Sequence, residues 1–292
     1  MSPKVLLIGL GGYGSRLISK ISEMKTQEKT FVLDSDRNCL EMTKAKRKIL
    51  IEDPVSSIKR DHVLQILSGT YRDFFASLEE YDLIFLCCGL GGRTGTVATT
   101  LIANIARNFA TVVCLAVIPF AVERKRYNMA LQFLEILRKM CDTLILMEND
   151  WLFRNCPPNM PTREALKVPE GIIATTITAM ANAITSPIAE FDADSFLKLL
   201  SSGGTSTMLF GEGKSCFEAL ESCLSRPLFN VDISSANSLF LHFETGKKSE
   251  AESAVYSLKP DFNVFLSFRE NEGERVFGVA FGIEPEIERY WR

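Results

Sequence analysis

Long apolar runs without polar alternation recur through the first half of the chain, and most are followed by segments with helical spacing of apolar positions. We predict strands at residues 4–10, 31–36, 48–51, 81–88, 111–120 and 142–150. We predict helices at residues 14–24, within 60–80, at 96–110 and at 126–140. Strands that are apolar on both faces and alternate with helices are typical of a parallel sheet covered by helices on both sides.

The pattern changes near residue 155. Residues 155–161 predict a loop, and residues 170–185 predict one long apolar helix. This helix is too short and too rich in threonine for a membrane span, so we expect it to be buried between two domains. Later segments predict strands at 238–245, 262–270 and 274–282 and helices at 214–225 and 249–258. The second half therefore predicts a smaller α/β domain with a mixed or antiparallel sheet.

The composition is that of a soluble globular protein, with 46% hydrophobic and 24% charged residues among 292. A net charge of −3 gives no electrostatic reason to expect nucleic acid or an anionic membrane as a partner. No apolar run reaches the roughly 18 residues that span a bilayer, and the apolar start leads directly into glycines, unlike a signal peptide. We expect a cytoplasmic protein without a direct membrane anchor.

Eight cysteines are scattered along the chain with only two histidines, and no cysteine pair has CxxC spacing. This pattern argues against a zinc site. We therefore expect reduced, mostly buried thiols and no metal site built from these side chains.

The segment IGLGGYGS, residues 8–15, lies between a predicted strand and a predicted helix. Gly9, Gly11 and Gly14 match G-x-G-x-x-G, and Asp34 ends the next strand 20 residues after Gly14. Alone, this pattern predicts a dinucleotide site, because glycines allow close approach to phosphates and the helix N-terminus supplies N–H donors. A tight turn without any ligand is the alternative.

A second glycine-rich segment, CCGLGGRTGT at residues 87–96, follows another predicted strand. It contains Gly89, Gly91, Gly92 and Gly95 together with Thr94 and Thr96. Parallel sheets bind ligands at the carboxyl ends of their strands, so two such loops predict a di- or triphosphate held from two sides. A further hypothesis is an NAD-dependent oxidoreductase, but an NAD site needs only one such loop and does not explain the second one.

GLGGRTGT resembles the tubulin/FtsZ signature GGGTGT[GA], and the match does not stand alone. Similar family segments follow in order: IGLGGYGS, LDSDRNCL, IPFAVERKR, DTLILMEND, LLSSGGTSTMLFGEG and RPLFNVDISSANSLFLHFETG. The resemblance covers nearly all of the chain. It implies the tubulin/FtsZ fold: a Rossmann-like parallel-sheet GTPase domain at 1–168, a long central helix at 169–186, and a smaller α/β C-terminal domain with a mixed sheet at 187–292.

The resemblance also implies GTP or GDP as the ligand, with Mg²⁺ as a further ion. The implied phosphate contacts are Gly11, Gly12, Tyr13 and Arg16 in the first loop and Gly89, Gly91, Gly92, Arg93, Thr94, Gly95 and Thr96 in the second. Glu123 and Arg126 would face the ribose and nearby groups, although alone the run ERKR is typical of a solvated charge cluster. Asn149 would bind the guanine edge, since an amide both donates and accepts hydrogen bonds.

Family members hydrolyse GTP between subunits, with acids after the central helix of one subunit reaching the nucleotide of the next. In AEFDADSF, residues 189–196, the resemblance assigns this catalytic role to Asp192 and to Asp194, which would stand in because Ser195 occupies the second acidic position. Glu190 occupies the position of a family asparagine. A helix N-cap at Asp192 or Asp194 is an equally good reading of these residues.

Several departures from the family leave the activity open. The third glycine loop, expected near 52–61, reads EDPVSSIKRD without glycine; Arg93 replaces a glycine; Arg16 occupies the place of an amide; and Pro169 or Glu170 falls where the family has a base-binding aspartate. The leading expectation is an FtsZ-like GTPase of the cytoskeleton and cell division, assembling head to tail with itself or a related FtsZ-like subunit. A non-hydrolysing, non-polymerising regulatory relative is the alternative. We expect no C-terminal tail for membrane-anchor proteins.

Overall fold

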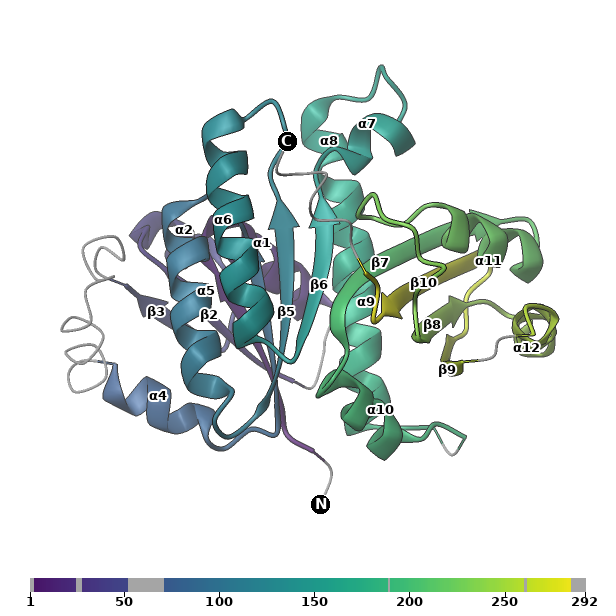
Figure 1. Ribbon diagram of the computed structural model, residues 1–292, viewed down its shortest axis with the longest axis horizontal. Helices are drawn as coiled ribbons and strands as arrows, with labels where there is room; N and C mark the ends of the chain where they lie inside the picture. The colour runs from purple at the N-terminus through teal and green to yellow at the C-terminus, as the bar shows by residue number, and fades with distance from the viewer. Residues whose placement is uncertain (1–2, 25–27, 52–70, 189, 260–261, 285–292) are drawn as a thin grey trace. The chain divides into compact units, whose positions relative to one another are not determined.

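The computed structural model describes residues 3–24, 28–51, 71–188, 190–259 and 262–284. The chain divides into two compact units, which are described separately (Figure 1). The first unit comprises Met1–Leu144 and Leu200–Ser202, and the second comprises Ile145–Leu199 and Gly203–Arg292. These compact units do not test the predicted functional division into a GTPase domain, a central helix and a C-terminal domain, with boundaries after residues 168 and 186, which stays a prediction.

The first unit is built on parallel strands in the order β3-β2-β1-β4-β5. Their bounds are β1 Val5–Leu10, β2 Lys29–Asp34, β3 Arg47–Leu50, β4 Leu83–Gly89 and β5 Thr111–Ile118. Every residue of β1 is buried, as is β4 up to its final glycine. This uninterrupted burial confirms the prediction, from apolar runs without alternation, of a parallel sheet covered on both faces.

Helices follow the strands of this unit: α1 Gly11–Glu23, α2 Arg37–Met42, α4 Arg72–Leu78, α5 Arg93–Ala106 and α6 Arg124–Met140. Helix α1 packs on β1, β2 and β4, and α5 packs on β4, on α1 and on α6. The predicted helical segment 60–80 is described only from Tyr71 onward, and its first part lies outside the described residues, as does the segment 52–61. The parallel order and these connections place the starts of α1 and α5 at one edge of the sheet.

Strand β6, Thr143–Glu148, contains the boundary between the units. The second unit continues with helices α7 Trp151–Asn155, α8 Thr162–Ala165, α9 Lys167–Thr185, α10 Ala193–Leu200, α11 Cys216–Ser225 and α12 Lys248–Ser257. Its further strands are β7 Gly204–Gly213, β8 Ser238–Glu244, β9 Asn263–Arg269 and β10 Glu274–Phe281. β10 pairs antiparallel with β7 and β8, while β8 and β9 are parallel, so the prediction of a mixed sheet is confirmed.

Strand β7 and the short helices α7 and α8 were absent from the predicted elements. The start of β7 reads as polar, yet Thr205, Ser206 and Thr207 are buried. Thr207 Oγ1 donates to the Leu146 carbonyl oxygen at 3.2 Å and accepts from the Phe229 N–H at 3.1 Å. Hydrogen bonds between strands and loops thus allow burial of side chains that a hydrophobicity pattern assigns to a loop.

Helix α9 corresponds to the predicted long apolar helix and is buried along most of its length. Within the second unit it contacts β7, β8 and β10. No helix among the described residues is long and apolar enough to cross a membrane. All eight cysteines are free, and five of them are buried.

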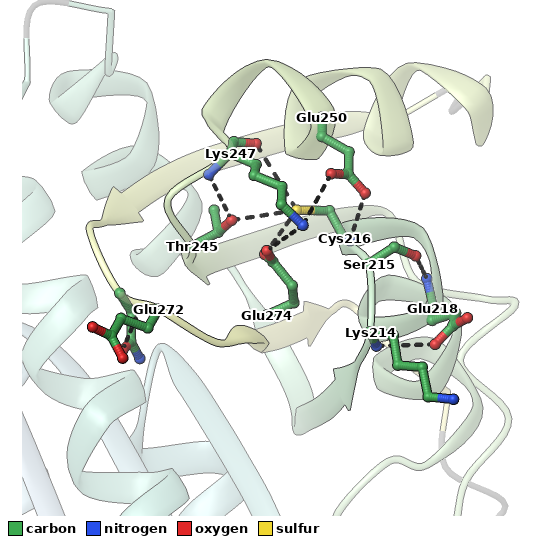
Figure 2. A network of polar contacts seen from close by, with 10 residues as sticks. Lys214, Ser215, Cys216, Glu218, Thr245, Lys247, Glu250, Glu272 and Glu274 are labelled. Atoms are coloured by element: carbon green, nitrogen blue, oxygen red, sulfur yellow. Dashed lines mark hydrogen bonds and ion pairs between the residues drawn. The ribbon is translucent and has the colours of Figure 1, made fainter.

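A network of polar contacts joins α11, α12 and β10 in the second unit (Figure 2). The Cys216 thiol donates to Glu274 Oε2 at 3.2 Å, and Lys247 Nζ lies 3.0 Å from Glu274 Oε1. The Cys216 N–H donates to Glu250 Oε1 at 3.1 Å, so a carboxylate from α12 binds the first N–H of α11. Burial would raise the pKa of Glu274, but hydrogen bonds from Thr245, Lys247 and Cys216 outweigh burial and lower it.

We expect Lys247→Met to lower the stability of the protein, because it leaves the buried Glu274 carboxylate without its cation. The matched control is Lys248→Met, since Lys248 pairs with Glu190 and Glu252 at the exposed surface and should matter little. Because the pKa of Glu274 is lower in the folded protein, its carboxylate stabilises the fold at pH values above its ordinary pKa of 4.5. This stabilisation is lost as the pH falls through the pKa of the folded state. Urea unfolding from pH 7 to pH 3 should therefore show a deficit for Lys247→Met that shrinks with acidification. Equal midpoints for both variants at pH 7 would contradict this account.

Candidate functional site

The two glycine loops begin at the carboxyl ends of neighbouring parallel strands. In the β1–β4 register Gly9 lies opposite Cys87 and Leu10 opposite Cys88. Helix α1 begins directly at Gly11 and helix α5 at Arg93, so both helix N-termini emerge at the same edge of the sheet. Gly11, Gly12 and Tyr13 of the expected first loop therefore lie in the first turn of α1, and Arg16 lies in its second turn.

The two loops are in direct backbone contact. Gly11 has φ +68°, and a Cβ there would lie 2.8 Å from the Gly95 nitrogen. A Cβ on Gly95 would lie 2.8 Å from the Gly89 oxygen and 3.1 Å from the Leu10 oxygen. Real side chains do not fit at such distances, so glycine at 11 and 95 is required for the loops to meet.

Other glycines are also explained by packing alone. A Cβ on Gly14 would collide with the Cys87 carbonyl oxygen. Gly91 has φ +77°, and a Cβ there would collide with the Arg126 carbonyl oxygen. This contact brings the start of α6 against the second loop. The fold itself therefore demands much of the glycine in both motifs.

Gly12 and Gly92 have no such explanation in the fold. A Cβ on Gly92 would meet nothing within 4 Å, and the residue has φ −94°, which any amino acid adopts. A Cβ on Gly12 would meet only the Arg16 Nη1 atom, at 3.9 Å. Gly92 therefore faces open space at the start of α5, and at the start of α1 Gly12 faces only the flexible end of the Arg16 side chain. Glycine there preserves room beside the backbone N–H groups of α1 and α5.

The polar groups at these helix starts suit an anion. No acidic residue lies in the first turn of α1 or α5, and no side chain caps either helix. The Thr96 hydroxyl is fully buried and has no hydrogen-bond partner among the described residues. Buried hydroxyls are rarely left unpaired, so Thr96 is expected to bind a group that comes from outside the chain.

Ser35 is a residue near the site that sequence reasoning missed. Its hydroxyl lies 2.6 Å from the Thr94 hydroxyl, and this hydrogen bond ties the end of β2 to the second loop. The signal was its position directly after Asp34, at the end of the strand beside β1. Asp34 itself is buried, accepts from the Asp36 N–H at 3.2 Å and lies 3.4 Å from the Ser15 hydroxyl, which ties β2 to α1.

The charged side chains of the site are mainly arginines. Arg16 and Arg93 are exposed, and Arg16 lies over the ring of Tyr13 and donates to the Gly12 carbonyl oxygen at 3.2 Å. Arg126 and Glu123 form an ion pair at 2.5 Å, with both side chains partly exposed. An exposed pair of this kind contributes little to stability.

Among the residues that the structure describes, the carboxylates near the loops do not form a set that fits a divalent cation. Asp34 is buried, Asp36 Oδ1 accepts from the N–H groups of Asn38 and Cys39 at the start of α2, and Glu123 pairs with Arg126. The residues described here contain no group of three or more His, Cys, Asp or Glu side chains that could hold a metal ion.

The remaining predicted site residues belong to the second unit. Asn149 follows β6 and is partly exposed. Asp192 is exposed, and its Oδ1 accepts from the Ser195 N–H at 2.9 Å, which is the N-cap arrangement of α10. Hydrogen bonds from the Ser195 side chain and N–H lower the pKa of Asp192. Asp194 is exposed in the first turn of the same helix.

Comparison with known proteins supplies the family. Residues 4–157 match the family model described as Tubulin/FtsZ family, GTPase domain. This chain belongs to the tubulin/FtsZ family. The resemblance found from GLGGRTGT is thus confirmed, together with the tubulin/FtsZ fold.

Relatives in this family match the chain nearly end to end. It is 28% identical over 97% of its length to cell division protein FtsZ 2 of Halobacterium salinarum, of which it covers 77%. It is 30% identical over 97% of its length to cell division protein FtsZ 2 of Haloferax volcanii, of which it covers 76%. Among solved structures, an empty FtsZ dimer from M. jannaschii has a TM-score of 0.85 and 26% identity, covering 97% of this chain and 89% of that one.

A more distant family structure shares the fold alone. CetZ2 from Haloferax volcanii, solved as a GTPγS-bound protofilament, has a TM-score of 0.77 at 15% identity, covering 99% of this chain and 96% of that one.

Proposed function

We propose that this tubulin/FtsZ family member binds GTP and GDP through its two glycine loops and acts as a cytoskeletal protein. The observation that carries the proposal is the pair Gly12 and Gly92, at which neither backbone conformation nor packing requires glycine. Space kept free beside two helix N-termini suits a phosphate chain. Two macrodipoles and the N–H groups of both first turns would then act on the same anion.

Three further features support a phosphate ligand. The buried Thr96 hydroxyl has no hydrogen-bond partner among the residues described. Arg16 and Arg93 bring positive charge to the two loops, and neither first turn contains an acid that would repel a phosphate. The preference for guanine rests on the family and on Asn149, which remains the proposed contact for the base edge.

Assembly and hydrolysis are the second part of the proposal. FtsZ from M. jannaschii has been solved as a dimer and CetZ2 from Haloferax volcanii as a protofilament, and two of the relatives compared above are named as cell division proteins. We propose that this chain assembles head to tail with copies of itself or with a related subunit, and that Asp192 or Asp194 positions the attacking water at the neighbour's nucleotide. A repeated head-to-tail contact that does not close produces a filament.

A nucleotide-binding relative without hydrolysis is a second candidate. The observation that favours it is the hydrogen bond from the Ser195 N–H to Asp192, which gives this carboxylate a structural role at the start of α10. The two candidates share the nucleotide site and differ in whether the acids touch water at a second subunit.

We expect Gly92→Val to fold like the parent and to lose at least tenfold in affinity for GDP, because its side chain would occupy the space beside the N-terminus of α5. Isothermal titration with GDP, GTP, ATP and NAD measures this loss and the preference for guanine. Gly273→Val is the control, since Gly273 also faces open space but lies in the second unit. Gly95→Ala should instead destabilise the apo protein by about 1–3 kcal/mol through overpacking between the loops.

Saturable NAD binding without guanine binding would overturn the proposed function. Unchanged GDP affinity in a correctly folded Gly92→Val protein would show that the open space beside α5 is not the phosphate site.

For hydrolysis, we expect Asp192→Asn and Asp194→Asn to bind GTP normally and at least one of them to lose turnover. Asparagine caps helices as well as aspartate does, so Asp192→Asn preserves the N-cap of α10 and removes only the charge. A carboxylate that orients water contributes directly to phosphoryl transfer. Phosphate release per subunit should also rise with protein concentration until assembly saturates. If turnover does not depend on protein concentration, or if the protein carrying both Asp192→Asn and Asp194→Asn is fully active, the two acids have no catalytic role and only cap α10.

A further inference from the structure

Arg93 is placed to act on whatever occupies the open space beside Gly92. It is the first residue of α5, directly after the N-cap Gly92. The Cα–Cβ bond of a helical residue tilts toward the helix N-terminus, so the Arg93 side chain leaves the backbone toward that end of α5. The side chain is exposed.

Arg16 occupies a related place on the first loop. It lies in the first turns of α1, donates to the Gly12 carbonyl oxygen and stacks over Tyr13 at 5.6 Å from the ring centroid. The contact between Gly11 and Gly95 holds the two loops together. The chain thus contributes arginines from both loops, while the described carboxylates nearby are buried, used as a cap or paired.

We propose that Arg93 supplies at the phosphates the positive charge that a divalent cation would otherwise supply, so that this chain binds guanine nucleotide without Mg²⁺. The inference rests on the proposed function, because it needs a nucleotide at the two loops. A guanidinium forms two parallel, charge-assisted hydrogen bonds to a phosphate. Two helix N-termini contribute only about half a unit charge each, so a triphosphate needs further cationic partners, and Arg93 directly follows Gly92 in the chain.

The test compares GDP and GTP affinities, by isothermal titration, in Mg²⁺ and in excess EDTA for the parent, Arg93→Gly and Arg138→Gly. Arg138 is an exposed arginine of the same unit near the end of α6, about 20 Å along the helix axis from its start. It controls for the loss of one positive charge. Thermal unfolding of the apo proteins confirms that each variant folds.

We expect the affinities of the parent and of Arg138→Gly to change less than threefold between Mg²⁺ and EDTA. Arg93→Gly should lose at least tenfold in EDTA and recover most of that loss in Mg²⁺. Strong Mg²⁺ dependence in the parent, or an Arg93→Gly loss that is equal with and without Mg²⁺ or absent altogether, would overturn the role of Arg93 while guanine binding stands. No guanine binding by the parent under either condition would instead overturn the proposed function.

Discussion

The close approach of Gly11 and Gly95 is the constraint on which the candidate site depends. Two parallel strands lie side by side with Leu10 opposite Cys88, and the backbones that follow them touch. Side chains at either glycine would separate the loops and the starts of α1 and α5. Because they touch, the N-termini of both helices lie at one edge of the sheet, where a single anion can interact with both.

Much of this arrangement could be predicted from the sequence. Apolar runs indicated the buried parallel strands, and the two glycine motifs indicated where the ligand edge would lie. The mixed second sheet followed from strands and helices of the later segments. Strand β7 was missed because Thr205, Ser206 and Thr207 read as polar, and the hydrogen bonds of the buried Thr207 hydroxyl join segments that are far apart in the sequence. The long apolar helix was recognisable because isoleucine, alanine and methionine surround its threonines along residues 170–185.

The sequence alone did not distinguish the glycines that the packing requires from those at which a side chain would fit. Gly92 and Gly95 stand three residues apart in one motif, yet only Gly95 is required by neighbouring backbone. That distinction depends on distances between chain segments that are far apart in sequence. The sequence alone also did not decide between the two roles of Asp192, a helix cap and a catalytic acid, and these two roles are compatible. A carboxylate with a lowered pKa that accepts one N–H bond retains lone pairs for a water molecule.

The central claim is that both loops together hold the phosphate chain of one nucleotide. Hydrogen–deuterium exchange of the backbone amides, measured with and without saturating GDP, tests it most directly. The account predicts that slowed exchange appears in residues 11–15 and 92–97 at the same GDP concentration, since a shared ligand must cover both helix starts. Protection confined to one loop, or its absence from both at saturation, would contradict the account.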